Sequence, residues 1–349
     1  MATSEPVTSS TNVSASSEKD VAAIDALRDI SKKIRDELAR VIIGQDEVIE
    51  QLLICIFARG HALLMGVPGL AKTLLIHSLA NVLSLKFSRI QFTPDLMPSD
   101  ITGTEILQET NQPGRRAFEF IKGPVFANII LADEINRTPP KTQAALLEAM
   151  QEHKVTAGGR IYTLDQPFFV LATQNPIEQE GTYPLPEAQL DRFMFFIHVG
   201  YPSQDEERRI ARETTGGATP PLNKLIDGEK LIAFQELVRR VPVPDHIYDF
   251  VVELVRASRP REATTPDWVK KLVTWGAGPR AVQNLILGAK ARAVLNGSYL
   301  VRQEDIEAVA RPVLTHRILT NFHAESEGIT SSDIIKRLTD EIHAVPKKA

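Results

Sequence analysis

The residues from Gly66 to Thr73 read Gly-Val-Pro-Gly-Leu-Ala-Lys-Thr, a combination suited to binding phosphate. Glycines let a loop turn its backbone N–H groups inward, and Lys72 and Thr73 add an ammonium and a hydroxyl at the start of an expected helix. The helix dipole favours an anion there, and the hydroxyl can ligate Mg²⁺. We therefore predict that a nucleoside triphosphate contacts the loop and its flanks: Gly66, Val67, Pro68, Gly69, Leu70, Ala71, Lys72, Thr73 and Leu74.

Ala71 stands where the general pattern Gly-x-x-x-x-Gly-Lys-[Ser/Thr] has its second glycine. Alanine has the smallest side chain that can replace glycine, and we expect it to be tolerated if the backbone φ at this position is negative. An ordinary Gly/Pro turn before a helix is the competing interpretation of the same letters.

Two adjacent acids, Asp133 and Glu134, end the apolar run 128–132. Such a run is typical of a strand buried on both faces of a parallel sheet, and parallel sheets bind ligands at the carboxyl ends of their strands. Asp133 is placed to hold the Mg²⁺ shell, and Glu134 to orient and deprotonate the water that attacks a γ-phosphate. Neighbouring strand residues point to opposite faces, so these roles require the strand to end here. Two surface acids at a strand end are the alternative.

Three further polar residues are candidates for the same chemistry. Asn175 ends another apolar run and can hydrogen-bond the γ-phosphate or the attacking water, or cap the turn that follows. Arg192 carries a guanidinium of the kind that stabilises phosphoryl-transfer charge, often from a neighbouring subunit, or it pairs with Asp191 or Glu187. Arg280 begins a helix, where a cation is unfavourable unless an anion is close, which indicates a phosphate or a carboxylate partner.

The patterns around these residues predict an α/β domain followed by a helical one. Strands are expected at residues 62–65, 88–93, 128–134, 168–175 and 194–199, with β-hairpins at 104–122 and 154–164. Helical spacing occurs at 18–40, 48–57 and 139–153, and after Pro202 at 204–213, 228–240, 245–259, 268–275, 279–296 and 303–319. We therefore expect a core at residues 18–203 and an all-helical domain at 204–349, preceded by a disordered Ser/Thr-rich tail at 1–17.

Composition narrows the function classes. A chain of 349 residues is long for one core, and its net charge of −4 gives no global attraction to nucleic acid or an anionic membrane. The single cysteine, Cys55, lies in an apolar run and is expected to be buried, which fits a reducing compartment. No apolar run has the length of a signal peptide core or a membrane span. We expect a soluble cytoplasmic protein without a transmembrane segment.

The order of these motifs resembles that of AAA+ ATPases, and more narrowly that of the MoxR family in the helix-two-insert clade. The matching segments are residues 41–45, 66–73, 122–126, 131–137, 172–176, 187–193 and 278–281. The resemblance extends from Glu18 to about Glu341. Ala71 is part of the family's own form of the phosphate loop.

The resemblance implies an α/β/α core with a parallel five-stranded sheet, an all-α lid, and hexameric rings with ATP between subunits. It also implies a role for each matching residue. Lys72 would contact the β and γ phosphates, Thr73 and Asp133 would hold Mg²⁺, and Glu134 would activate water.

The remaining roles implied by the resemblance concern residues near subunit interfaces. Asn175 would be the first sensor, Arg192 the arginine finger acting on the next subunit's ATP, and Arg280 the second sensor. Ile43 and Gly44 would form part of the adenine pocket, and Arg137 would face a neighbouring subunit.

The function implied is hydrolysis of ATP to ADP and phosphate, coupled to chaperone-like remodelling, assembly or metal-cofactor maturation of protein complexes, with a von Willebrand factor A domain protein as partner. The alternatives are a magnesium-chelatase-like subunit, a polynucleotide motor and an ATP-gated scaffold without hydrolysis. The acid pair Asp133 and Glu134 argues against the scaffold. No nucleic acid is expected, because the basic residues of the first hairpin are offset by acids (Arg115, Arg116 and Lys122 against Glu105, Glu109 and Glu119).

Overall fold

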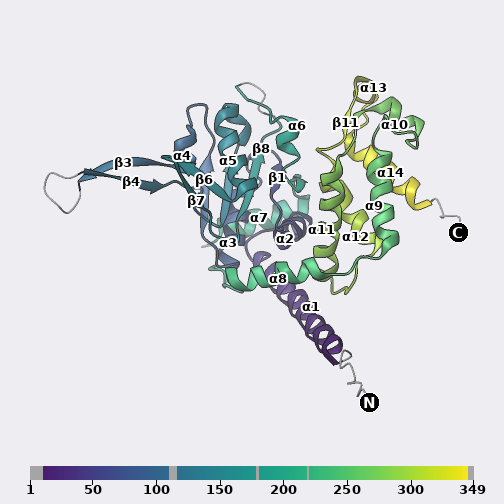
Figure 1. Cartoon of the computed structure of the whole chain (residues 1–349), viewed down its shortest axis with the longest axis horizontal. Helices are drawn as coiled ribbons and strands as arrows, with labels where there is room; N and C mark the ends of the chain where they lie inside the picture. The colour runs from purple at the N-terminus through teal and green to yellow at the C-terminus, as the bar shows by residue number, and fades with distance from the viewer. Residues whose placement is uncertain (1–10, 110–115, 178–180, 218–219, 345–349) are drawn as a thin grey trace, which may run out of the picture.

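The computed structural model describes residues 11–109, 116–177, 181–217 and 220–344. A core that contains the main sheet lies beside a mostly helical lid, and one long β-hairpin extends away from the core (Figure 1). Within the described residues, no helix is both long and apolar enough to cross a membrane.

The main sheet has five parallel strands, as the resemblance implied, and their order is β2-β5-β8-β1-β9. Its strands are β1 (Ala62–Met65), β2 (Phe87–Gln91), β5 (Ile129–Asp133), β8 (Phe169–Gln174) and β9 (Phe195–His198). Helices cover both faces of this sheet. Apolar side chains on either face of the central strands are therefore buried, which is why apolar runs form these strands. The parallel order places the carboxyl ends of all five strands at one edge of the sheet.

The two faces of the sheet belong to two buried clusters. Leu64 of β1 and Leu171 of β8 pack into one cluster, together with α1 (Thr11–Leu38), α2 (Asp46–Phe57) and α3 (Lys72–Val82). The neighbouring residues Leu63 and Val170 point to the other face and pack against α4 (Pro98–Thr102) and α5 (Pro140–Glu152). This alternation is the period of two that strands impose on side chains.

The lid follows β9 and consists of α7 (Gln204–Thr215), α8 (Gly228–Arg240), α9 (Asp245–Ala257), α10 (Asp267–Leu272), α11 (Pro279–Leu295), α12 (Gln303–Leu314), α13 (Phe322–Ser326) and α14 (Ser331–Ala344). Helix α11 packs against α1 and α2, and α12 packs against β9. The buried cluster on this face of the sheet therefore continues into the lid, and residues 203 and 204 do not separate two independent cores.

The lid is not all helical. Strand β10 (Val273–Trp275) pairs in antiparallel fashion with β11 (Leu319–Thr320), where the sequence had indicated the ends of two helices. Val, Thr and Trp favour extended backbone, but three residues are too few to show a strand period. The partner strand lies more than forty residues along the chain, so the sequence pattern gave no sign of the pairing.

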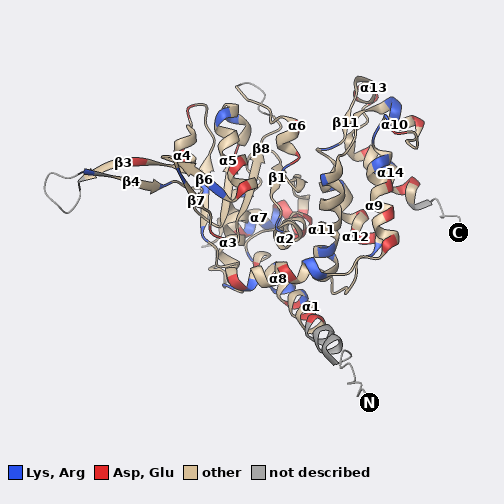
Figure 2. Cartoon of the chain, in the orientation of Figure 1, with Lys and Arg blue, Asp and Glu red and all other residues tan. Residues whose placement is uncertain are grey.

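Both predicted β-hairpins are present. Strands β3 (Gly103–Glu109) and β4 (Arg116–Lys122) form the long arm in Figure 1, and β6 (Lys154–Ala157) pairs with β7 (Arg160–Thr163). The rings of Phe120 and Tyr162 stack at 4.1 Å between centroids and join the two hairpins. In Figure 2 both blue (Lys, Arg) and red (Asp, Glu) stretches of ribbon occur along the arm, in agreement with the mixed charge of its sequence.

Helix α1 begins at Thr11, so the assignment of residues 11–17 to a disordered tail was wrong. Ile24 and Leu27 anchor the helix in the core, and each residue added beyond an anchored turn gains a hydrogen bond at little further cost. The segment contains no Gly or Pro that would stop the helix. Residues 1–10 of the expected tail lie outside the described residues.

Candidate functional site

The phosphate loop connects the carboxyl end of β1 to the first turn of α3, which begins at Lys72. The ammonium of Lys72 donates hydrogen bonds to the carbonyl oxygens of Gly66 and Val67, the latter at 2.9 Å. Gly69 has φ +85°, and a Cβ at Gly66 would lie 2.7 Å from the carbonyl oxygen of Val199. Both glycines are thus required by the backbone path, one by its conformation and one by close packing.

Ala71 has φ +54° and ψ +22°, so the condition under which we expected alanine to be tolerated, a negative φ, is not met. A left-handed conformation costs a residue with a Cβ about 1–2 kcal/mol. Ala71 caps α3 directly before Lys72, so the strain lies beside the lysine. Strained backbone of this kind persists where the surrounding structure fixes it.

Asp133 and Glu134 differ in backbone conformation, as their separate roles require. Strand β5 ends at Asp133, and Glu134 adopts the left-handed conformation with φ +57° before the short 3₁₀ helix Ile135–Arg137. Thr173, at the end of neighbouring β8, contacts both acids. Its hydroxyl donates to Oδ1 of Asp133 at 2.6 Å and accepts the backbone N–H of Glu134 at 2.9 Å. Thr173 thereby fixes the acid pair across two strands.

Arg89 and Gln91, which the sequence reasoning missed, complete the surroundings of the acids together with Arg137. Arg89 of β2 donates to Oδ2 of Asp133 at 2.6 Å. Glu134 accepts hydrogen bonds from Gln91 at 3.1 Å and from Arg137 at 3.0 Å. β2 pairs with β5 in a register that sets Gln91 opposite Asp133, and this register is not visible in the sequence. Arg137 therefore contacts the acid of its own chain.

The loop, the acids and Asn175 line one cavity of about 400 Å³ at the carboxyl edge of the sheet. Partial burial lowers the pKa of Lys72, and the opposing influence comes from the charges of Asp133 and Glu134 across the cavity. Asn175 lies at the cavity wall, and its side-chain oxygen also accepts the N–H of Ile177 at 3.1 Å. The turn-capping interpretation of Asn175 is therefore confirmed, and its contact with a phosphate or a water stays a prediction. The structure brings together the predicted loop residues, Asp133, Glu134 and Asn175.

A smaller cavity, lined mainly by apolar side chains, adjoins this one and shares with it Gly69, Leu70, Ala71 and Leu74. Ile43 and Gly44, the residues expected to contact adenine, line it. Gly44 has φ +72°, and a Cβ there would lie 2.4 Å from Glu206 at the start of α7. Gln45 donates to the carbonyl of Leu70 at 2.8 Å, while its buried side-chain oxygen has no partner among the residues that the structure describes. The cavity walls are thus mainly apolar.

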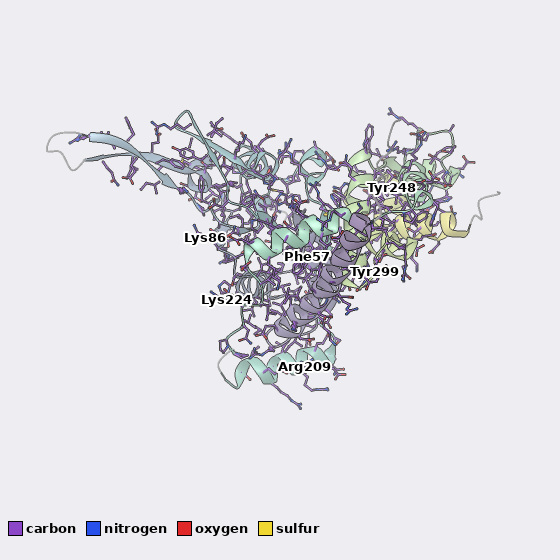
Figure 3. The ribbon with its side chains drawn as sticks, turned by 60° about the horizontal axis from the view of Figure 1, so that its bottom comes forward. Phe57, Lys86, Arg209, Lys224, Tyr248 and Tyr299 are labelled. Atoms are coloured by element: carbon purple, nitrogen blue, oxygen red, sulfur yellow. The ribbon has the colours of Figure 1, made fainter. Side chains whose placement is uncertain are left out.

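Helix α7 closes the smaller cavity from the lid side through Ile210 and Thr214. None of its residues is buried, and Figure 3 shows the helix, marked by Arg209, at the periphery of the molecule. The wall it contributes is therefore held by few contacts and belongs to the least anchored part of the lid.

The two predicted arginines lie elsewhere. Arg192 precedes β9 and lines a third cavity with Gly60 and His61, which precede β1. These positions are at the amino edge of the parallel sheet, opposite the phosphate loop. Arg280, at the start of α11, lines the same cavity and pairs with Asp191 at 3.0 Å. The structure therefore does not bring Arg192 or Arg280 to the cavity that contains Lys72.

The anion close to Arg280 at the start of α11 is thus the carboxylate of Asp191, which belongs to the α/β domain. Arg192 has no ion pair with Asp191 or Glu187 within the part of the chain that the structure describes. Asp191 instead pairs with Arg280 and with Arg317 of the lid. The local ion pair that we considered as an alternative role for Arg192 is absent.

Comparison with known proteins agrees with this arrangement. Residues 61–195 match the family model described as ATPase family associated with various cellular activities (AAA), and residues 266–338 match that of the AAA lid domain. The chain is 45% identical to the chaperone MoxR1 of Mycobacterium tuberculosis, over 89% of this chain and 83% of the relative. The chain belongs to the MoxR family of AAA+ ATPases. As a MoxR-family member it is an ATP hydrolase with an α/β core and a lid.

Two further relatives have similar extents. The MoxR-family chain is 40% identical to the uncharacterized protein YeaC of Bacillus subtilis, over 89% of this chain and 93% of the relative. It also superposes, with a TM-score of 0.85 and 43% identity, on the crystal structure of a Cytophaga hutchinsonii protein to which ATPase activity has been attributed. That match covers 96% of this chain and 98% of the other. The fold is therefore shared over nearly the whole length, lid included.

Proposed function

We propose that this MoxR-family ATPase acts as a ring of identical subunits, hexameric by resemblance, whose ATP sites are each built from two subunits. The observation that carries the proposal is the position of the candidate groups on opposite edges of one sheet. Lys72 and Glu134 lie at the carboxyl edge, and Arg192 and Arg280 at the amino edge. Even β1, with 4 residues, separates its two ends by roughly 13 Å. A guanidinium at the amino edge is therefore available to a neighbour's phosphates and not to its own.

Within one subunit the residues suit ATP and Mg²⁺. The hydroxyl of Thr73 and the carboxylate of Asp133 are the hard oxygen ligands that Mg²⁺ prefers, and Mg²⁺ would neutralise charge on the phosphates. Lys72 would leave the loop carbonyls for the β and γ phosphates. Glu134 would take the proton of the attacking water, and Asn175 would hold that water or the γ-phosphate.

The smaller cavity suits adenine. Ile43 and the loop residues offer apolar faces to the base. Gly44 provides backbone polar groups beside it.

Across the interface, Arg192 and Arg280 of the next subunit would stabilise the charge that develops on the transferred phosphoryl group. Hydrolysis would relax that interface and move the two hairpins. The exposed Leu107 and Phe118 of the longer hairpin offer an apolar surface to a client. The activity that fits is chaperone-like remodelling, assembly or metal-cofactor maturation of a protein complex, with a von Willebrand factor A domain protein as partner.

A Glu134→Gln variant tests this function. It keeps the shape of the site and loses the base, so we expect ATP affinity within about twofold of the wild type and phosphate release reduced at least about a hundredfold. Held in the ATP state, the variant should retain its client in affinity purification, whereas Lys72→Ala should retain neither ATP nor client.

The material that is retained decides between the alternatives. A protein complex with a von Willebrand factor A domain protein would support the proposal. Tetrapyrrole-biosynthesis proteins would favour the magnesium-chelatase-like function, and salt-dependent retention of DNA that stimulates wild-type turnover would favour a polynucleotide motor. Normal turnover by Glu134→Gln would remove the proposed base.

A further inference from the structure

We propose that Arg317 of the lid is a positioning residue that holds the segment Asp191–Met194, and with it Arg192, in the geometry needed to serve the neighbouring subunit. The inference rests on the function proposed above, because Arg192 acts in it as the group supplied across the interface. Arg317 does not touch ATP or phosphate in this arrangement. Its contribution is made through the backbone of the residues on either side of Arg192.

The contacts of Arg317 converge on this one segment. Its guanidinium donates to Oδ1 of Asp191 at 2.7 Å and to the carbonyl oxygen of the same residue at 2.9 Å. Further hydrogen bonds reach the carbonyl oxygens of Phe193 at 2.8 Å and Met194 at 3.3 Å. The last donor bonds Val313 in the same lid segment. Arg317 thus contacts the residue before Arg192 and both residues after it.

This geometry needs an arginine. The side chain of Arg317 is only 2% exposed, so each donor has lost its water and depends on the protein acceptor it faces. Guanidinium presents its donors in a fixed plane, whereas a lysine ammonium is a single point that cannot reach the same set. A lysine at this position would keep the charge and lose most of the contacts.

His316, the preceding residue, holds the same segment. Its Nε2 lies 3.0 Å from the carbonyl oxygen of Phe193, and its ring stacks on Phe196 of β9 with 5.8 Å between centroids. Two consecutive lid residues therefore bind the turn that leads from α6 (Glu187–Leu190) into β9. Backbone hydrogen bonds also hold the turn within the core, from the N–H of Arg192 to Gln189 at 3.2 Å and from the N–H of Met194 to His61 at 2.8 Å, so His316 and Arg317 add the contacts that come from the lid.

Arg280 and Arg317 share Asp191 but differ in how firmly they hold it. Arg280 is 44% exposed and makes a single ion pair, which contributes little in water. Arg280 can therefore leave Asp191 for a phosphate, while Arg317 keeps the carboxylate and the backbone in place. A movement of the lid would therefore move Arg317 and, with it, the segment Asp191–Met194.

Subunit mixing separates a positioning role from a general structural one. Arg317→Lys and Arg317→Met should bind ATP within about twofold of the wild type while phosphate release falls at least about tenfold, because their phosphate loops are intact. Mixing either variant with Lys72→Ala should restore turnover, since the Lys72 variant supplies an undisturbed Arg192 to its neighbour. Mixing with Arg192→Ala should restore nothing, because both partners lack a working finger. Asp191→Asn should give the same pattern.

Arg292→Met is the matched control. Arg292 forms a partly buried ion pair with Asp305 at 2.7 Å in the same lid, away from residues 191–194. We expect Arg292→Met to lower the melting temperature and to leave the turnover of the folded protein within about twofold.

The inference would be overturned if Arg317→Met showed wild-type turnover. It would also be overturned if mixing with Lys72→Ala restored the turnover of Arg192→Ala but not that of the Arg317 variants. If Lys72→Ala fails to restore Arg192→Ala itself, the two-subunit site is wrong, and the positioning role argued from it is wrong too.

Discussion

Arg280 donates a hydrogen bond of 3.0 Å to Oδ2 of Asp191, although 89 residues separate them in the chain. The contact sets a lid guanidinium directly beside the residue that precedes Arg192. Both arginines consequently lie at the amino edge of the sheet, while Lys72 lies at the other edge. If the lid closed over the phosphates of its own chain, Arg280 would be expected near Lys72. Its position at the opposite edge of the sheet fits a lid that contributes to the next subunit's site.

Replacing Arg280 by Ala should therefore reduce turnover without affecting nucleotide affinity in the subunit that carries the change. We expect phosphate release to fall at least about tenfold, because a group that stabilises transition-state charge is lost. ATP affinity, measured by titration calorimetry on subunits too dilute to assemble, should stay within about twofold. Arg302, another exposed lid arginine paired with an acid, provides the control, and Arg302→Ala should change neither quantity. A large loss of affinity in the dilute Arg280 variant would show that Arg280 acts on its own chain's nucleotide.

Thr173 should matter for catalysis through its two contacts with the acid pair. Thr173→Val keeps the shape and removes the hydroxyl, which leaves Oδ1 of Asp133 and the N–H of Glu134 without their partner. An unsatisfied group of this kind costs about 1–3 kcal/mol, so we expect turnover to fall roughly tenfold to a hundredfold. Thr173→Ser retains the hydroxyl and should keep most of the activity. Equal losses in both variants would point to the lost methyl group and not to the hydrogen bonds.

His61 should make the stability of the protein depend on pH. Its Nδ1 accepts the N–H of Val170 at 2.9 Å, and Nε2 lies 3.2 Å from the carbonyl of Met150, so the buried ring is neutral with the proton on Nε2. Burial lowers the pKa of His61 from 6.5 to about 4. A lowered folded-state pKa means that the unfolded chain binds the proton more readily, so stability is lost as pH falls from 6.5 towards 4.

The contribution of His61 over this range is about 3 kcal/mol. Urea unfolding at several pH values measures it. His61→Asn, whose side-chain oxygen can replace the Nδ1 acceptor, should be less stable at pH 7.5 but should lose stability less steeply towards pH 4. If the slope of unfolding free energy against pH is the same in both proteins, His61 does not carry this linkage.

Much of the fold and half of the site followed from the sequence. Four of the five strands of the main sheet were predictable because each is an apolar run too short for a helix, whereas β2 mixes polar and apolar residues. The phosphate loop was predictable because it joins one apolar run to a helix. Asp133, Glu134 and Asn175 end neighbouring strands of a parallel sheet, so their proximity follows from the topology. These features depend on local patterns and on one general rule about strand ends.

The remainder depends on information that local patterns do not contain. The positive φ of Ala71 is set by the loop as a whole, and Arg89 contacts Asp133 because of how β2 and β5 align. Arg280 and Arg317 reach Asp191 from far along the chain. Arg317 follows a helix without any motif around it, and only the buried position of a charged residue, which sequence does not show, marks it as unusual.

The two-subunit site is tested most directly by mixing Arg192→Ala with Lys72→Ala and measuring phosphate release. Each variant alone should be nearly inactive. A one-to-one mixture that exchanges subunits should regain up to about a quarter of the wild-type rate, because one interface in four then joins an intact phosphate loop to an intact finger. If no mixture exceeds the sum of its two components, Arg192 does not act across the interface and the account is contradicted.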